Sequence, residues 1–228
     1  MKRGGQYIKD MVYGANDGII TTFAVIAGAA GASLDVFAAT TLAVANLLAD
    51  GFSMAASDYL GSKSEEDVTE SEFKEEVVEI DTKPDVERGE MVVLLKEQGY
   101  EDIDAQALTA LMFKNKHFFT DLMMHEEHNL SLHGSESASH SALVTFFSFV
   151  FAGAIPLIPL LWVRDIKIVF YYSIVMTTAT LFCVGALRSI VTRRGLVYSG
   201  LQMLFVGGVA ALLAYGIGAL LRGVIGIV

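Results

Sequence analysis

Four polar or sulfur-bearing side chains recur at every fourth position in the second half of an apolar segment, residues 11–59. They are Asn46, Asp50, Met54 and Asp58, and this spacing places them on one face of a helix. A carboxylate within an apolar membrane segment is costly and is retained chiefly where it lines a pathway or has a partner. The stripe therefore indicates a polar path, although a protonated Asp50, an interfacial Asp58 and a packing role for Met54 remain open.

Asp17 adds a further carboxylate in the first half of the same segment. The two halves meet at a turn near Asp35, and Asp17 lies about 18 residues before this turn and Met54 about 19 after it. At roughly 1.5 Å of rise per residue, both reach a similar depth. We therefore expect the Asp17 carboxylate and the Met54 thioether to face each other, and the thioether favours transition metals over hard cations.

A second group of candidate ligands lies in a strongly acidic segment, residues 58–140. This segment holds 21 of the 26 acidic residues and 7 of the 16 basic ones, so it attracts cations and repels nucleic acid. Two carboxylate pairs within it are spaced at i, i+3, where their repulsion is unfavourable unless solvent or a cation screens it. They are Glu76 with Glu79 and Glu87 with Glu90. A solvated charged helix is the simpler explanation for either pair taken alone.

The end of the acidic segment combines three kinds of metal donor. The sequence from Met123 to His128 reads MMHEEH and concentrates thioether, imidazole and carboxylate groups on one short helix. Carboxylates bind hard cations but also Fe²⁺ and Mn²⁺, and imidazole shifts a site toward transition metals. Met123 and Met124 taken alone would be core residues.

Long apolar helices must position these residues. Hydrophobic residues make up 53% of the 228 and the mean hydropathy is +0.50, which is typical of a membrane protein. Besides residues 11–59, which supply two spans, three runs are long enough to cross a hydrocarbon core of roughly 30 Å. These runs are residues 141–163, 168–187 and 196–221. We expect an all-α fold with five membrane helices, and Pro156 and Pro159 should interrupt the third.

The acidic insert lies between the second and third membrane helices and divides the chain into three parts. They are residues 1–58 with membrane helices 1 and 2, residues 59–140 as a helical metal-binding insert, and residues 141–228 with membrane helices 3 to 5. Basic residues favour the cytosolic side, and a cytosolic N-terminus places six of them inside and three outside. The inside set is Lys2, Arg3, Lys9, Arg188, Arg193 and Arg194, and the outside set is Arg164, Lys167 and Arg222. The insert is then cytosolic as well.

Helix-breaking and capping residues predict four helices in the insert. The first continues out of the membrane and ends before Pro84, which suits the first turn of the next helix. That second helix ends near Gly99, and Asp102 or Asp104 offers an N-cap for the third. The last two helices are expected over residues 105–116 and 117–132.

Small residues recur along the first apolar helix and permit close approach of another helix. They are Gly14, Gly18, Ala27, Gly28 and Gly31. Packing within one subunit is the simplest use of such a surface.

The chain resembles the vacuolar iron transporter family over nearly its whole length. The similarity rests on the Asp17-Gly18 pair of the first helix and on the run ADGFSMAASDY over residues 49–59 of the second. Two departures bear on metal selectivity more than on transport. Asn46 stands where the family has Glu, and Ser57-Asp58 replaces Gly-Glu.

The resemblance also implies a metal site in the insert, a homodimer with pathway residues at the subunit interface, and proton-coupled transport. Seven residues of the insert match the family pattern of carboxylates and methionines: Glu76, Glu79, Glu87, Glu90, Met123, Met124 and Glu127. The last carboxylate of that pattern has no counterpart, and His125 and His128 are the candidates to compensate. With Asp17, Asp50 and Met54 in the membrane, these residues make up the expected metal sites.

We expect a proton-coupled antiporter that exports Fe²⁺, or Mn²⁺, from the cytosol, with no enzymatic activity and no prosthetic group. A carboxylate at low dielectric holds either a proton or a cation, so exchanging one for the other yields antiport. Two alternatives are a membrane-anchored di-iron enzyme, whose Glu-x-x-His motif is absent from the sequence, and a metal sensor or scaffold without flux. The short tails favour a prokaryotic cell (inner) membrane, and the vacuolar membrane is expected if the protein is eukaryotic.

Overall fold

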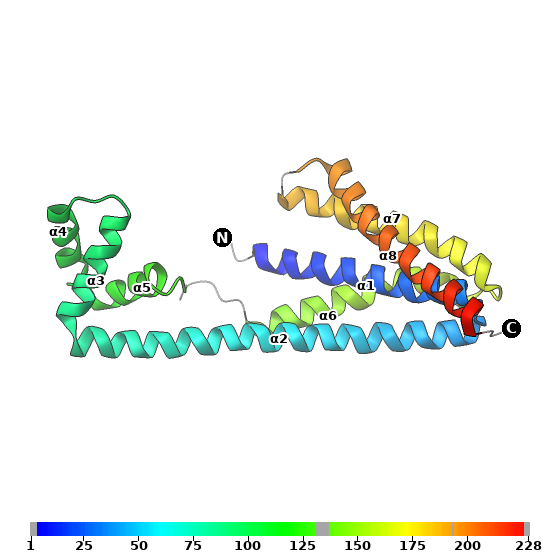
Figure 1. Cartoon of the computed structure of the whole chain (residues 1–228), viewed down its shortest axis with the longest axis horizontal. Helices are drawn as coiled ribbons and strands as arrows, with labels where there is room; N and C mark the ends of the chain where they lie inside the picture. Colours follow the sequence, from blue (N-terminus) through cyan, green and yellow to red (C-terminus); the bar gives the residue numbers. More distant parts are fainter. Residues whose placement is uncertain (1–3, 131–136, 193, 226–228) are drawn as a thin grey trace. The chain divides into compact units, whose positions relative to one another are not determined.

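A computed structural model of the chain describes residues 4–130, 137–192 and 194–225, and the regular structure of these residues is entirely helical (Figure 1). The expected all-α class is confirmed. Lys2, Arg3 and Arg193, three of the basic residues expected on the cytosolic side, lie outside the described residues. The chain divides into two compact units, one formed by Met1–Tyr59 and Glu136–Val228 and the other by Leu60–Ser135.

Five helical segments in the described part of the chain are long and apolar enough to cross a membrane, as expected. They are α1 (Gly4–Ala32), the apolar first half of α2 (Val36–Thr82), α6 (Ala138–Ala154) with the 3₁₀ helix η1 (Ile155–Leu161), α7 (Ile166–Thr192) and α8 (Leu196–Ile225). The charged second half of α2 belongs to the other unit.

The turn between α1 and α2 lies where the sequence predicts it. Ser33 has a positive φ of 55°, and the Asp35 carboxylate accepts a hydrogen bond of 3.0 Å from the backbone N–H of Ala38. This contact satisfies one of the free N–H groups at the start of α2. The turn therefore sets the end of α1 and the start of α2.

The two prolines interrupt the third span as expected. The α-helix ends at Ala154, and the chain continues as the 3₁₀ helix η1, which contains Pro156 and Pro159. Because proline removes a backbone donor, carbonyl groups of the preceding turn lose their helical partner. The Ser173 hydroxyl of α7 donates a hydrogen bond of 2.8 Å to the Pro156 carbonyl oxygen, which also ties η1 to α7.

The membrane unit is built around α1, which lies between α6 on one side and α7 and α8 on the other (Figure 1). At Gly18 an added Cβ would lie 2.3 Å from the Phe149 carbonyl oxygen, and at Gly31 the same distance from the Tyr215 carbonyl oxygen. Small residues of α1 thus serve close packing within one chain. α1 packs extensively against α6 and α8, and Ile26 and Ala29 of α1 also share a buried apolar cluster with Ala39 of α2.

The acidic unit contains the charged half of α2 followed by α3 (Pro84–Glu97), α4 (Asp102–Met112) and α5 (Lys116–Glu126). Pro84 begins α3, and Gly99 follows it with a φ of +99°, both as predicted. Its apolar core consists of Ile80, Met91, Phe119 and Met123, which are at most 1% exposed.

Several helix ends in this unit differ from the prediction. The N-cap position of α4 is Glu101, and Asp102 instead lies in the first turn and pairs with Lys96 at 2.9 Å. The third helix ends at Met112 because Asn115 caps α5, accepting a hydrogen bond from the Phe118 N–H. The fourth ends at Glu126, six residues earlier than expected over 117–132, and Asn129 then adopts a left-handed φ of 55°. The side-chain cap at Asn115 and the turn at Asn129 were not among the capping residues on which the predicted boundaries rested.

Candidate metal sites

Three carboxylates converge in the acidic unit, two from α3 and one from the residue that follows α5. Ligand oxygens of Glu87 and Glu90 on α3 and of Glu127 after α5 lie within 4.8 Å of one another. Glu87 is only 2% exposed, whereas Glu90 and Glu127 are exposed. The arrangement offers an all-oxygen site that is open to solvent on one side and can accept a divalent cation.

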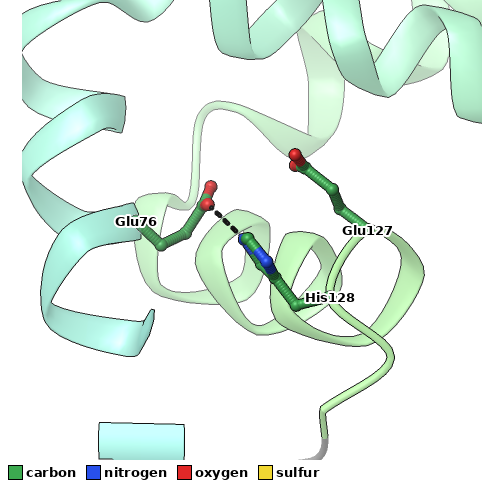
Figure 2. Close-up of side chains that lie close together, drawn as sticks. All are labelled: Glu76, Glu127 and His128. Carbon is green, nitrogen blue, oxygen red and sulfur yellow. Dashed lines mark hydrogen bonds and ion pairs between the residues drawn. The ribbon is translucent and has the colours of Figure 1, made fainter. Parts of the chain in front are cut away.

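A second group shares Glu127 with the first. Ligand atoms of Glu76, Glu127 and His128 also lie within 4.8 Å of one another, and Figure 2 shows the Glu76 carboxylate of α2 directed at the His128 ring. The distance from His128 Nε2 to Glu76 Oε2 is 3.3 Å. Glu76 is 2% exposed, so this second group contains a nearly buried carboxylate.

The clustered charges perturb the titration of the acidic unit. Burial, followed by repulsion from Glu76 and Glu90, raises the pKa of Glu87 to about 7. Burial and the charge of Glu90 raise the pKa of Glu127 as well. Burial opposes the charged form of His128, but its hydrogen bond with Glu76 and the charge of Glu127 outweigh that effect and raise its pKa. A cation at this cluster would relieve the repulsion that burial makes costly.

The other expected ligands of the insert are Glu79, Met123 and Met124. Glu79 forms an ion pair of 2.7 Å with Lys83. Met123 belongs to the apolar core around Phe119, which is the packing role that the sequence left open, and Met124 is fully buried. A ligand role for these three residues stays a prediction.

In the membrane unit, Asp17 and Asp50 lie close enough for their charges to interact. Next to Asp17, the side-chain Oδ1 of Asn16 is buried, and no described residue supplies it with a hydrogen-bond partner. The stripe residues Asn46, Asp50, Met54 and Asp58 are all half-buried, as expected for residues on a common helix face. The expected approach of Met54 to Asp17 stays a prediction.

Further polar contacts link α6 to the first two membrane helices. The Thr145 hydroxyl donates a hydrogen bond of 2.8 Å to Asp58, and the Ser141 hydroxyl donates one to the buried Asp10. Asp10 was missed by the sequence interpretation, although it precedes Asp17 by seven residues and so shares its helix face. Asp10 and Asp17 thus lie on one side of α1.

Glu72 was also missed. Its Oε2 lies 3.7 Å from His128 Nδ1, and the signal that could have found it is its spacing of four residues before Glu76 on the same helix face. The two carboxylate pairs predicted in the insert are spaced by three residues instead.

Comparison with known proteins identifies the chain's relatives. A model of the VIT family matches residues 8–219. The vacuolar iron transporter of Toxoplasma gondii is 34% identical over 96% of this chain and 76% of its own length. That of Centaurea cyanus is 32% identical over 93% and 86%, and vacuolar iron transporter 1 of Arabidopsis thaliana is 29% identical over 92% and 84%. With its five apolar helices, the chain is a multi-pass membrane protein that belongs to the VIT family.

Proposed function

We propose that this protein is a proton-coupled antiporter that exports Fe²⁺, or Mn²⁺, from the cytosol. Its relatives are named vacuolar iron transporters, which supports metal-ion transport. The observation that carries the proposal is the convergence of Glu87, Glu90 and Glu127 in a unit that holds most of the chain's negative charge. Such a cluster raises the local concentration of cations and gives them oxygen ligands.

Residues 59–140 act as the cytosolic collecting domain in this proposal. The N-terminus is cytosolic as well, since that orientation places the majority of the basic residues inside. The raised pKa of Glu87, about 7, supports reversible binding, because a proton competes with the metal near neutral pH. The collecting domain would therefore bind metal and also release it.

Asp17, Asp50 and Met54 form the membrane pathway. Two carboxylates that repel each other in an apolar environment are stabilised by a proton or by a divalent cation. Binding of metal therefore displaces protons, and the return of protons releases the metal on the other side. The Met54 thioether favours transition metals over Ca²⁺ and Mg²⁺.

The transporter functions as a homodimer in this proposal. Five helices are few to enclose a polar path, and the stripe residues of α2 remain half-buried in one chain. On the same helix Phe37, Leu48 and Phe52 are more than half exposed. A second copy beside α2 would complete the path with its own carboxylates.

The test is metal-driven proton movement in sealed proteoliposomes that contain the full-length protein. We expect an outward Fe²⁺ gradient to drive proton flux in the opposite direction, with competition from Mn²⁺ but little from Ca²⁺. Metal uptake without proton movement would remove the antiport mechanism. Binding without any uptake would leave a sensor or scaffold.

A further inference from the structure

The imidazole of His128 lies between two carboxylates that come from successive turns of α2. Its Nε2 is 3.3 Å from Glu76 Oε2, and its Nδ1 is 3.7 Å from Glu72 Oε2. Figure 2 shows the ring beside Glu76 and Glu127. Each ring nitrogen therefore has its own acidic neighbour, and the two nitrogens have different surroundings.

One oxygen atom of the Glu76 carboxylate lacks a hydrogen-bond partner among the described residues. Its Oε1 atom is buried, and no described residue gives it a hydrogen bond. A buried carboxylate oxygen without a partner is unfavourable because it has lost its water. Since Glu76, Glu127 and His128 offer ligand atoms within 4.8 Å of one another, a cation bound among them would supply the missing partner.

The backbone after α5 holds His128 in position. The N–H of Glu127 donates to the Met123 carbonyl at 2.9 Å, and the N–H of Leu130 donates to the Met124 carbonyl at 2.8 Å. Asn129 adopts a left-handed conformation, which lets the chain turn back to form these hydrogen bonds. Met123, whose carbonyl accepts one of them, is fixed in the apolar core. His128 is thus placed by the fold of the unit, unlike His125, whose side chain is 65% exposed.

We propose that His128 Nε2 is a metal ligand and forms, with Glu76 and Glu127, a mixed nitrogen and oxygen site for divalent transition metals. Glu72 is a positioning residue: the charge of its carboxylate, 3.7 Å from Nδ1, favours the tautomer with the proton on Nδ1, so that the Nε2 lone pair faces the metal. Glu127 joins this site to the all-carboxylate group of Glu87 and Glu90. The proposal rests on the collecting role proposed above and adds its selectivity.

The chemical consequence is discrimination between cations. Carboxylates alone accept Ca²⁺ and Mg²⁺ as readily as many transition metals, whereas imidazole favours Fe²⁺, Co²⁺ and Zn²⁺. The His128 site would therefore retain transition metals in a cytosol that is rich in Mg²⁺. The carboxylate group beside it supplies charge without this preference.

The test compares His128→Leu with the matched control His125→Leu in the full-length, detergent-solubilised protein. Titration with Co²⁺ by calorimetry and by visible absorption, and with Ca²⁺ by calorimetry, measures both affinities. We expect His128→Leu to lose about tenfold or more in Co²⁺ affinity and to bind Ca²⁺ as the wild type does. His125→Leu should bind both ions normally, and Glu72→Gln should weaken Co²⁺ less than His128→Leu.

Pulsed electron paramagnetic resonance of bound Mn²⁺ gives a direct readout of the ligand. We expect a coupling to ¹⁴N in the wild type and in His125→Leu, and its loss in His128→Leu. Unchanged Co²⁺ affinity and a retained ¹⁴N coupling in His128→Leu would overturn the imidazole site while leaving the collecting role intact. Absence of Co²⁺ and Mn²⁺ binding in the wild type would overturn both.

Discussion

Glu87 connects the stability of the acidic unit to pH. Its pKa is about 7 against an ordinary value of 4.5, so the folded unit holds this proton more tightly than the unfolded chain does. The stabilisation is fully present below pH 4.5 and is lost as the pH rises to about 7. In the absence of metal, α3 should therefore unfold locally more often at neutral pH than at pH 5.

The size of this effect follows from the shift. At about 1.4 kcal/mol for each tenfold change in proton affinity, the full rise corresponds to roughly 3 kcal/mol. Solvent around the exposed Glu90 screens part of the repulsion, so we expect about 1–3 kcal/mol. Glu87→Gln should remove most of the dependence, because the amide does not titrate and keeps the size of the side chain.

Hydrogen exchange measured by mass spectrometry on peptides from α3 tests this prediction. The full-length protein is compared with Glu87→Gln in chelator from pH 5 to 7.5, after correction for the intrinsic pH dependence of exchange. Saturating Co²⁺ should restore protection at neutral pH in the wild type, since metal replaces the proton as counter-charge. Equal protection at both pH values in the wild type would refute the buried, repelled carboxylate.

Three further predictions concern the two units separately. Met54→Leu preserves volume but removes the thioether, so Fe²⁺ flux in proteoliposomes should fall while insertion is normal; equal flux would reduce Met54 to packing. Glu90→Gln should weaken Co²⁺ binding about tenfold by calorimetry, whereas the control Glu97→Gln on the same helix should not, and equal affinities would count against the carboxylate group. Gly18→Val would place a Cβ 2.3 Å from the Phe149 carbonyl oxygen. We expect this clash to lower the free energy of unfolding by about 1–3 kcal/mol and to lower the melting temperature of the purified protein. An unchanged melting temperature would contradict the close packing of α1 on α6.

Sequence patterns predicted the ends of the helices better than they predicted which helices pack against one another. Pro84 and Gly99 act within one or two turns of backbone, so their effects on helix ends can be foreseen. The place of α1 between α6 and α8 depends instead on which small residues meet, and Gly18 gives no sign in sequence that its partner is Phe149. The close approach of Gly18 to the Phe149 carbonyl oxygen is visible only in the folded chain.

The same limit applies to the candidate sites. The spacing of Glu87 and Glu90 predicted their shared face, but the contact of Glu76 with His128 joins residues 52 positions apart. Only the folded unit brings them together. The contact of Asp10 with Ser141 spans 131 positions and was equally beyond the reach of local patterns.

In the proposed mechanism the Asp17 carboxylate alternates between metal and proton in the membrane. Asp17→Asn keeps size and hydrogen-bonding capacity but can neither carry charge nor gain a proton. The direct measurement is Fe²⁺ flux and proton flux recorded together in proteoliposomes for wild type and Asp17→Asn. We expect the variant to insert normally and to lose both fluxes, because an arriving cation meets no compensating charge. Coupled transport at the wild-type rate by a correctly folded Asp17→Asn protein would contradict the account and move the exchanging site to Asp50.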